Sequence, residues 1–167
     1  KRVAINSALN YFLAEDVLAP ICVPLFNQSA MDGYAFKFED VHQQLNIVDT
    51  IPAGDVRIVE VKKGEAVRIF TGSKVPDSCD TVVMQELTTV NGNLLSVEDE
   101  GLKYGGNVRK KGNQIKEGDV ALKKGTRINA AAIGFLTTLG FTHVEVFDLP
   151  KITIIATGSE LVELGKP

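Results

Sequence analysis

Short apolar runs separated by polar turns dominate the middle of the chain, between residues 45 and 123. The runs are rich in Val, Ile, Leu and Thr, and Gly or Asn residues punctuate them: "LNIVDT", "AVRIF", "TVVMQELTTV" and "LLSVED". Such side chains favour strands, and turns at this spacing are typical of a barrel or coiled-sheet module. Asn91-Gly92, between two of the runs, predicts a hairpin. The pattern therefore predicts a β-rich central region.

One segment, "INAAAIGFLTTLG" at residues 128–140, has the pattern of a helix. Asn129 is suited to cap its N-terminus, and Gly140 stands where a helix commonly ends on a glycine. "HVEVFD" follows as a predicted strand, with Val144 and Val146 on one face. A helix of this kind beside many short strands indicates a mixed α/β fold dominated by strands.

The first 35 residues predict a short helical turn and an edge strand. Asn6 or Ser7 is suited to cap a turn that runs through Leu9. The run "YFLAEDVLAP" alternates loosely between apolar and polar residues and ends at a proline, as edge strands often do.

The last 17 residues read differently, as a buried strand over residues 152–156, a Thr-Gly-Ser turn and an opening helix. A strand that leads into a helix is half of a βαβ unit, which needs a parallel partner strand. We therefore expect this segment to begin another domain.

Composition narrows the class of protein. Apolar residues make up 44% and charged residues 23%, as in ordinary globular domains, and the net charge of −3 gives no general attraction to nucleic acid or to anionic membranes. No apolar run is long enough to cross a bilayer. Cys22 and Cys79 have no pairing pattern, and the two histidines add no zinc motif. We expect buried thiols in a reducing, cytoplasmic setting.

The segment "NQSAMDGYAF", residues 27–36, is the first candidate for chemistry. Asp32 stands among the small residues Ser29 and Gly33, which let the backbone approach a ligand closely. Its carboxylate can accept hydrogen bonds from a substrate or bind a cation through oxygen. The alternative is a turn in which Asp32 bonds backbone amides.

Two further stretches offer groups that bind anions. Thr71-Gly72-Ser73 follows a predicted strand and offers hydroxyls and N–H groups, although it also suits an ordinary turn. Arg109, Lys110 and Lys111 form a basic group between glycines, and an arginine can bind phosphate or carboxylate through two nitrogens. The alternative is a solvated charged loop.

The fourth stretch, "TGSEL" at residues 157–161, has a glycine turn between a predicted strand and a predicted helix. N–H groups at such a helix N-terminus bind phosphate. Glu160 also suits the first turn of a helix through its charge alone, and both interpretations stay open from the residues.

The order and spacing of these segments resemble one family. "AEDVLAPICVPLFNQSAMDGYAF", "GEAVRIFTGSKVPDSCDTVVMQE", "GNVRKKGNQIKEGDVALKKGTRINAAAIGFLTTLG" and "PKITIIATGSEL" closely resemble the MoeA family, the molybdopterin molybdenumtransferases related to the E domain of gephyrin. The resemblance runs from about residue 13 to residue 161, nearly the whole chain.

The resemblance implies a reaction and an organisation. Family members take adenylylated molybdopterin and molybdate as substrates, release AMP and leave molybdenum on the dithiolene, with a divalent cation, usually Mg²⁺. They are homodimers, and the molybdopterin adenylyltransferase is a candidate partner. The family pattern assigns residues 1–35 and 124–150 to a dimerisation subdomain and 36–123 to a β-rich, barrel-like subdomain with coiled sheets. Residues 151–167 would start the molybdopterin-binding domain.

The resemblance also gives roles to individual residues. Asp32 and Thr71 match residues that lie at the family's active site, and they are the predicted catalytic pair. Asp32 and Glu160 are the predicted metal ligands. The predicted cofactor-binding residues are Ser29, Gly33, Gly72, Arg109 and Glu160.

Two departures from the family pattern reduce the negative charge at the predicted metal. Gln114 stands where the family has an acidic residue, and Ser159 replaces the acid of the family's TGDEL segment. They favour one alternative to the N-terminal part of a molybdenum insertase, a dimerisation or scaffold module that kept the fold without the chemistry. A β-rich small-molecule domain unrelated to molybdenum is a third interpretation, which does not depend on these departures.

Overall fold

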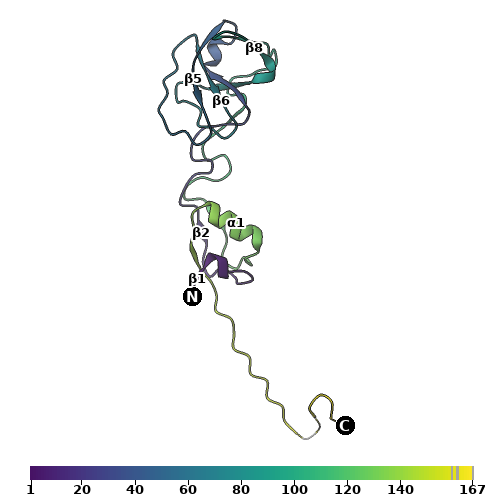
Figure 1. Ribbon diagram of the computed structural model, residues 1–167. Coiled ribbons are helices and arrows are strands. Elements are labelled where there is room, and N and C mark those ends of the chain that lie inside the picture. The colour runs from purple at the N-terminus through teal and green to yellow at the C-terminus, as the bar shows by residue number, and fades with distance from the viewer. Residues whose placement is uncertain (159, 161, 167) are drawn as a thin grey trace. The chain divides into compact units, whose positions relative to one another are not determined.

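The computed structural model describes residues 1–158, 160 and 162–166 (Figure 1). The chain divides into two compact units. The helical unit comprises Lys1–Asp16 and Leu122–Pro167, and the β unit comprises Val17–Ala121. The roles that the family pattern assigns to its subdomains stay predictions.

The helical unit is built around α1 and a pair of antiparallel strands, β1 and β12. Its elements are β1 (Arg2–Ala4), the 3₁₀ turn η1 (Ile5–Ser7), α1 (Ala130–Thr138) and β12 (His143–Glu145). The α1 helix contacts η1. The unit's buried apolar side chains include Leu13, Ile128, Leu136, Leu139 and Val146. Each such buried side chain contributes about 1.5–3 kcal/mol relative to exposure.

Local sequence signals set both ends of α1, as predicted. The side chain of Asn129 accepts a hydrogen bond from the backbone N–H of Ala132 at 2.8 Å, which caps the N-terminus. At the other end Gly140 has a φ of +88°, and the N–H of Phe141 donates to the carbonyl of Leu136 at 3.0 Å. This is the glycine-terminated end that the sequence indicates.

Two predictions for the ends of the chain are wrong. The N-terminal turn is η1, whose N-cap is Ala4 without a side-chain hydrogen bond, so Asn6 and Ser7 lie inside the turn instead of capping it. Residues 152–156 form no strand, and Ile154 is 90% exposed. A strand needs a hydrogen-bonded neighbour, and the described residues pair none with this segment. Part of the predicted turn and helix, Ser159 and Leu161, lies outside the described residues.

The β unit contains a six-stranded sheet in the order β7-β4-β6-β5-β9-β8. Neighbouring strands are antiparallel except β5 and β6, which run parallel. These strands are β4 (Gly33–Phe36), β5 (Leu45–Ile51), β6 (Glu65–Ile69), β7 (Thr81–Met84), β8 (Thr88–Asn91) and β9 (Leu94–Val97). Figure 1 shows the sheet curling, with β5 and β6 side by side. The predicted β-dominated fold with a barrel-like part is confirmed.

Smaller elements complete the β unit. They are β2 (Val17–Leu18), β3 (Gln28–Ser29), β10 (Val108–Arg109) and the 3₁₀ turns η2 (Phe38–Asp40) and η3 (Gln85–Leu87), with β11 (Val120–Leu122) at the boundary of the unit. β3 pairs with β10, and β2 with β11. The predicted hairpin at Asn91-Gly92 is confirmed, because it joins β8 to β9. The run "TVVMQELTTV" is not one strand, since η3 divides it into β7 and β8.

The curled sheet is buried on both faces. Neighbouring residues on three of its strands belong to two different apolar clusters, as Ala35 and Phe36 do on β4 and Val82 and Val83 do on β7. Successive side chains on a strand point to opposite faces, so each cluster covers one face. This two-sided burial fixes the strand register, because a shift by one residue would exchange the two sets.

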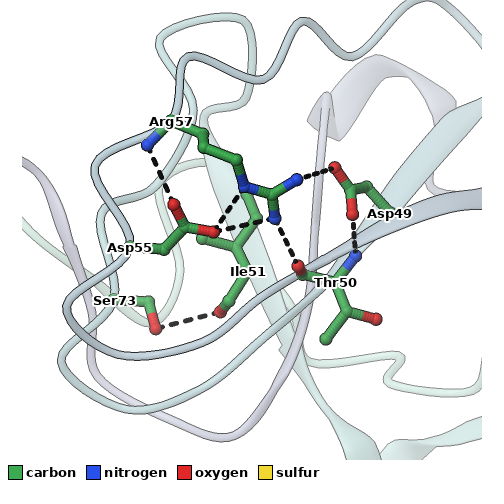
Figure 2. A network of polar contacts seen from close by, with 6 residues as sticks. All are labelled: Asp49, Thr50, Ile51, Asp55, Arg57 and Ser73. Carbon is green, nitrogen blue, oxygen red and sulfur yellow. Dashed lines mark hydrogen bonds and ion pairs between the residues drawn. The ribbon is translucent and has the colours of Figure 1, made fainter.

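An exposed arginine ties the connection between β5 and β6 to β5. Figure 2 shows the guanidinium of Arg57 between the carboxylates of Asp55, at 2.8 Å, and Asp49, at 3.3 Å. One of its nitrogens also donates to the carbonyl of Thr50 at 3.1 Å. The Arg57 side chain is 57% exposed, so we expect these ion pairs to add little to stability.

Candidate functional site

The strand pairing of the β unit brings two turns together. One turn precedes β4 and contains Asp32, and the other follows β6 and contains Thr71. In the ladder between these strands, Gly33 lies opposite Ile69. Because the two strands are antiparallel, the beginning of β4 meets the end of β6. Asp32 and Thr71 are therefore neighbours although 39 positions separate them in the sequence.

Thr71 donates two hydrogen bonds to one oxygen of the Asp32 carboxylate. Its backbone N–H lies 2.7 Å from Oδ1, and its hydroxyl lies 2.8 Å from the same atom. These two bonds hold the pKa of Asp32 below its ordinary value, and the backbone bond has the larger effect. The charge of Arg68 lowers this pKa further. Both residues are exposed. The turn thus presents an ionised carboxylate to solvent at neutral pH.

Gly33 has a packing reason to be glycine. A Cβ added at this position would lie 1.8 Å from the carbonyl oxygen of Val83 on β7. No side chain fits there, so glycine allows β4 and β7 to pair beside Asp32. The sequence predicts a close approach of the backbone to a ligand, whereas the structure shows that glycine is needed here for the close pairing of two strands. The contact of Gly33 with a cofactor stays a prediction.

Ser29 and Gly72 shape the same pair of turns. The N–H of Gly72 donates to the carbonyl of Ser29 at 3.0 Å, and Gly72 has a φ of +89°, a conformation that favours glycine. Ser29 is buried, and its hydroxyl donates to the carbonyl of Met31 at 2.6 Å. Both residues therefore belong to the cluster around Asp32. Their contact with a cofactor stays a prediction.

Arg109 joins this cluster through strand pairing. It lies on β10 opposite Gln28 of β3, and the side chain of Gln28 donates to the carbonyl of Gly72 at 3.0 Å. Arg109 is exposed, as are Lys110 and Lys111 beside it. The β unit therefore places a basic segment next to the turn that contains Gly72, as an anion site requires.

Glu160, a predicted metal and cofactor ligand, belongs to the helical unit and is exposed. Ser159, the departure beside it, lies outside the described residues. Gln114 lies in the β unit, where its backbone N–H donates to the carbonyl of Val23 at 2.9 Å and its side chain is exposed. The structure thus brings together the predicted site residues of the β unit, which are Ser29, Asp32, Gly33, Thr71, Gly72 and Arg109. The role of Glu160 as a metal ligand stays a prediction.

A metal at Asp32 would need ligands beyond the protein groups gathered there. Among the described residues, no three His, Cys, Asp or Glu side chains form a group that could hold a metal ion. The Oδ1 atom of Asp32 already accepts both bonds from Thr71. Mg²⁺ commonly binds through one or two carboxylates together with water and substrate phosphates. The residues present fit a Mg²⁺ ion of that kind, held partly by a phosphorylated substrate.

Three residues at the site received no role from the sequence. Arg68 donates to the carbonyl of Gly33 at 3.2 Å and to the side chain of Gln85. Gln85 in turn donates to the carboxylate of Glu86 at 2.9 Å. Arg68 belongs to the quoted "RIFTG" segment, and the other two belong to "VVMQE". Their role depends on the register between β4, β6 and β7, which the sequence does not give.

A pocket of about 210 Å³ lies elsewhere on the β unit. Its lining includes Ile51, Asp55, Arg57 and Lys74, and neither Asp32 nor Thr71 lines it. Arg57 is paired with Asp55 (Figure 2), and Lys74 pairs with Asp77 at 3.5 Å. Because both of these cations are paired with acidic neighbours, we place the candidate site at Asp32 and not in this pocket.

Among residues 1–158, 160 and 162–166, the structure contains no helix with the length and apolar character needed to span a membrane.

Comparisons with known proteins agree on one family. A family model described as "MoeA N-terminal region (domain I and II)" matches residues 1–140. The molybdopterin molybdenumtransferase of Staphylococcus epidermidis is 37% identical over 169 residues, which cover 97% of this chain and 40% of that protein. The enzyme of the same name from Haemophilus influenzae is 38% identical over 165 residues, covering 98% of this chain and 41% of that protein.

A solved structure gives the same result in three dimensions. The crystal structure of a molybdopterin biosynthesis MoeA protein from Pyrococcus horikoshii matches with a TM-score of 0.90 and 32% identity. The match covers 100% of this chain and 44% of that chain. The chain therefore spans about 40% of the length of the curated relatives that it matches.

Proposed function

Because the chain belongs to the MoeA family, we propose that it is the N-terminal part of a molybdenum insertase. The reaction transfers molybdenum from molybdate to adenylylated molybdopterin and releases AMP. The observation that carries the proposal is the pair of Asp32 and Thr71, which presents an ionised carboxylate on a turn fixed by two hydrogen bonds. The Staphylococcus and Haemophilus relatives are named for this transfer.

In this reaction Asp32 is the group that approaches the reacting phosphate or oxyanion. An exposed carboxylate repels a polyanionic substrate unless a cation lies between them. Asp32 would hold that cation, Mg²⁺, together with phosphate oxygens of the substrate, and the cation would neutralise charge at the phosphate and molybdate oxygens. The role of Glu160 as a further ligand stays a prediction from the family pattern. Thr71 keeps Asp32 ionised and orients it, because both its bonds end on a single carboxylate oxygen.

The anionic parts of the substrate would bind beside this carboxylate, to the backbone N–H groups of the turn at Gly72 and to the guanidinium of Arg109. Gly72 opens the backbone in a left-handed turn, and Arg109 lies on the strand next to it. A guanidinium binds phosphate or carboxylate through two parallel hydrogen bonds. Gln114 stands where the family has an acid, and its amide cannot supply a negative charge to a cation. Binding of the cation therefore depends more strongly on the carboxylate of Asp32.

The proposal is tested by Asp32→Asn in the longest native form of the chain. The assay measures AMP release from adenylylated molybdopterin in the presence of molybdate and Mg²⁺. Loss of the charge should lower turnover by about 100-fold or more, as removal of a catalytic group typically does. Asp77→Asn is the matched control, because Asp77 is an exposed aspartate of the β unit paired only with Lys74 among the described residues. Full activity of the Asp32 variant would reject the proposal.

The proposal includes a homodimer formed through the helical unit. Phe12, Phe147 and Leu149 are 45%, 48% and 60% exposed in this unit, although large apolar side chains are usually buried. The exposed positions at the start of α1 are the small apolar residues Ala130 and Ala131. A second copy of the chain would cover this surface, as the symmetry of most homo-oligomers allows.

Sedimentation of the chain at increasing concentration tests the homodimer. Phe147→Glu should shift the protein towards the monomer, because a charge at an apolar contact must be desolvated. Leu25→Glu changes a similarly exposed apolar side chain of the β unit and should leave the association unchanged. Equal masses for all three proteins at every concentration would contradict this part of the proposal.

The remaining parts of the proposal concern the cell. We expect a cytoplasmic protein, in which the half-buried Cys22 and the buried Cys79 stay reduced. The molybdopterin adenylyltransferase is the proposed partner, because it would supply the adenylylated substrate. Copurification of that enzyme with the longest native form of the chain would support this, and its absence at high loading would contradict it.

A further inference from the structure

Arg68 is held in an unusually complete set of contacts beside Asp32. It lies on β6 opposite Tyr34 of β4. The centre of its guanidinium is 5.0 Å from the ring centroid of Tyr34 and 5.0 Å from that of Phe70. Cation–π contacts of this geometry stabilise an arginine and limit its rotamers. The guanidinium is therefore a fixed charge, unlike a solvated surface arginine.

The hydrogen bonds of Arg68 lead to two consecutive backbone carbonyls, those of Asp32 and Gly33. One nitrogen donates to the carbonyl of Gly33, the residue after Asp32, at 3.2 Å. Another donates to the side chain of Gln85, whose own backbone N–H donates to the carbonyl of Asp32 at 3.0 Å. Arg68 therefore bonds the carbonyl of Gly33 directly. The carbonyl of Asp32 is bonded by Gln85, whose side chain Arg68 holds.

The same arginine is a cation near two carboxylates. Glu86 receives a hydrogen bond from the side chain of Gln85 at 2.9 Å, and this bond is the largest cause of its lowered pKa. A backbone hydrogen bond is the second cause, and the charge of Arg68 contributes less. Thr71 lowers the pKa of Asp32 through its two bonds, and Arg68 adds to that effect through its charge. Asp32 and Glu86 act on each other in the opposite direction, since the charge of Asp32 raises the pKa of Glu86. The charge of Arg68 offsets part of this repulsion.

We propose that Arg68 is a positioning residue for Asp32, which it holds through the Gly33 carbonyl and the side chain of Gln85. It does not contact the substrate in this proposal. It fixes the backbone from which the carboxylate projects and balances the charge of Glu86 beside it. The proposal deepens the proposed function, and it rests on that function in so far as Asp32 is catalytic. The pairing of strands β4, β6 and β7 supplies all the groups involved.

A purely structural role would give a different result from a positioning role. If Arg68 serves only to cover the rings of Tyr34 and Phe70, its replacement by methionine keeps most of the apolar contact and loses stability alone. A positioning role also predicts a change at the Asp32 carboxylate itself. Arg68→Lys separates the effect of the charge from the effect of the hydrogen bonds, because lysine keeps the charge but lacks the planar fork of donors.

The first experiment measures the titration of the Asp32 carboxyl carbon by NMR in the 167-residue chain, with Asp32→Asn to assign the signal. Arg68→Met should raise the pKa of Asp32 only part of the way towards its ordinary value, because the two bonds from Thr71 lower this pKa more than the charge of Arg68 does. Arg68→Lys, which keeps the charge, should raise it less. Arg57→Met is the matched control, since Arg57 is also an ion-paired arginine of the β unit but contacts Asp49 and Asp55 (Figure 2). It should leave the titration of Asp32 unchanged.

The second experiment measures kcat and KM of the same variants in the longest native form. Arg68→Met should lower kcat by about 10- to 100-fold, because a small misplacement of a catalytic group is costly, while KM changes little. Arg68→Lys should restore the titration better than it restores kcat. If the Asp32 titration and kcat of Arg68→Met were both the same as in wild type, the inference would be overturned.

Two further results keep the inference separate from the function on which it rests. If Asp32→Asn retains full activity, the proposed function fails, and the titration still decides whether Arg68 acts on Asp32. If Arg68→Met does not fold, Gln85→Ala replaces it, because Gln85 is exposed and its loss removes one link between Arg68 and the turn. An unchanged kcat in that variant, with an unchanged titration, would also overturn the inference.

Discussion

Thr71 donates both its backbone N–H and its hydroxyl to the same oxygen of Asp32, at 2.7 Å and 2.8 Å. The two residues lie in turns beside different strands, so the bonds fasten the end of β6 to the beginning of β4. They also leave the second carboxylate oxygen of Asp32 for an outside partner. The same two bonds therefore stabilise the turn and keep the Asp32 carboxylate ionised.

Replacing Thr71 with valine should raise the pKa of Asp32 part of the way to its ordinary value. Valine keeps the shape of the side chain and removes the hydroxyl bond, which is the second cause of the lowered pKa. The backbone bond, which is the largest cause, remains. NMR titration of the carboxyl carbon measures the change. Thr89→Val is the control, because the Thr89 hydroxyl donates to Glu98 and not to Asp32. Identical Asp32 titrations in wild type and Thr71→Val would show that the hydroxyl bond is not formed in solution.

The contribution of Asp32 to stability should disappear in acid. Its pKa is lowered on folding, so the ionised form favours the folded state at pH values well above the unfolded value of 3.8. This advantage is lost as the pH falls from 3.8 through the lower folded value, since the folded carboxylate then takes up a proton too. Urea unfolding of wild type and Asp32→Asn should differ most near neutral pH.

The comparison with Asp32→Asn isolates this one group, because other carboxylates with lowered pKa values, such as Asp55, titrate alike in both proteins. A difference in stability that stayed constant as the pH fell through this range would contradict the lowered pKa of Asp32.

Local signals in the sequence sufficed for the elements that depend on local geometry. Asn129 and Gly140 mark the two ends of α1, and Asn91-Gly92 marks the hairpin, because capping and tight turns involve residues close in sequence. The division of "TVVMQELTTV" by η3 was missed, since its apolar and β-branched residues favour a strand throughout. For residues 152–156, pairing decides the structure, and composition alone does not predict it.

The candidate site was likewise predicted only in part from the sequence. Asp32 and Thr71 were found as parts of motifs that the family resemblance joins. Their direct hydrogen bonds depend on the register of β4 and β6, which sequence patterns do not specify. Arg68 illustrates the limit, because its position in "RIFTG" suggests an ordinary strand residue. Its pairing opposite Tyr34 and its hydrogen bond to the carbonyl of Gly33 show that its charge lies near Asp32.

Gly33→Ala should destabilise the β unit severely, because the new methyl group would lie 1.8 Å from the carbonyl oxygen of Val83. Strands β4 and β7 would have to separate, and we expect a loss of about 3 kcal/mol or more in the free energy of unfolding. Gly134→Ala is the matched control. A Cβ at this helical position meets nothing within 4 Å, so alanine should stabilise α1 by about 0.5–1 kcal/mol. Thermal and urea unfolding measure both variants. If Gly33→Ala were as stable as wild type, the close pairing of β4 with β7 beside Asp32 would be wrong, and with it the packing reason for a glycine in this motif.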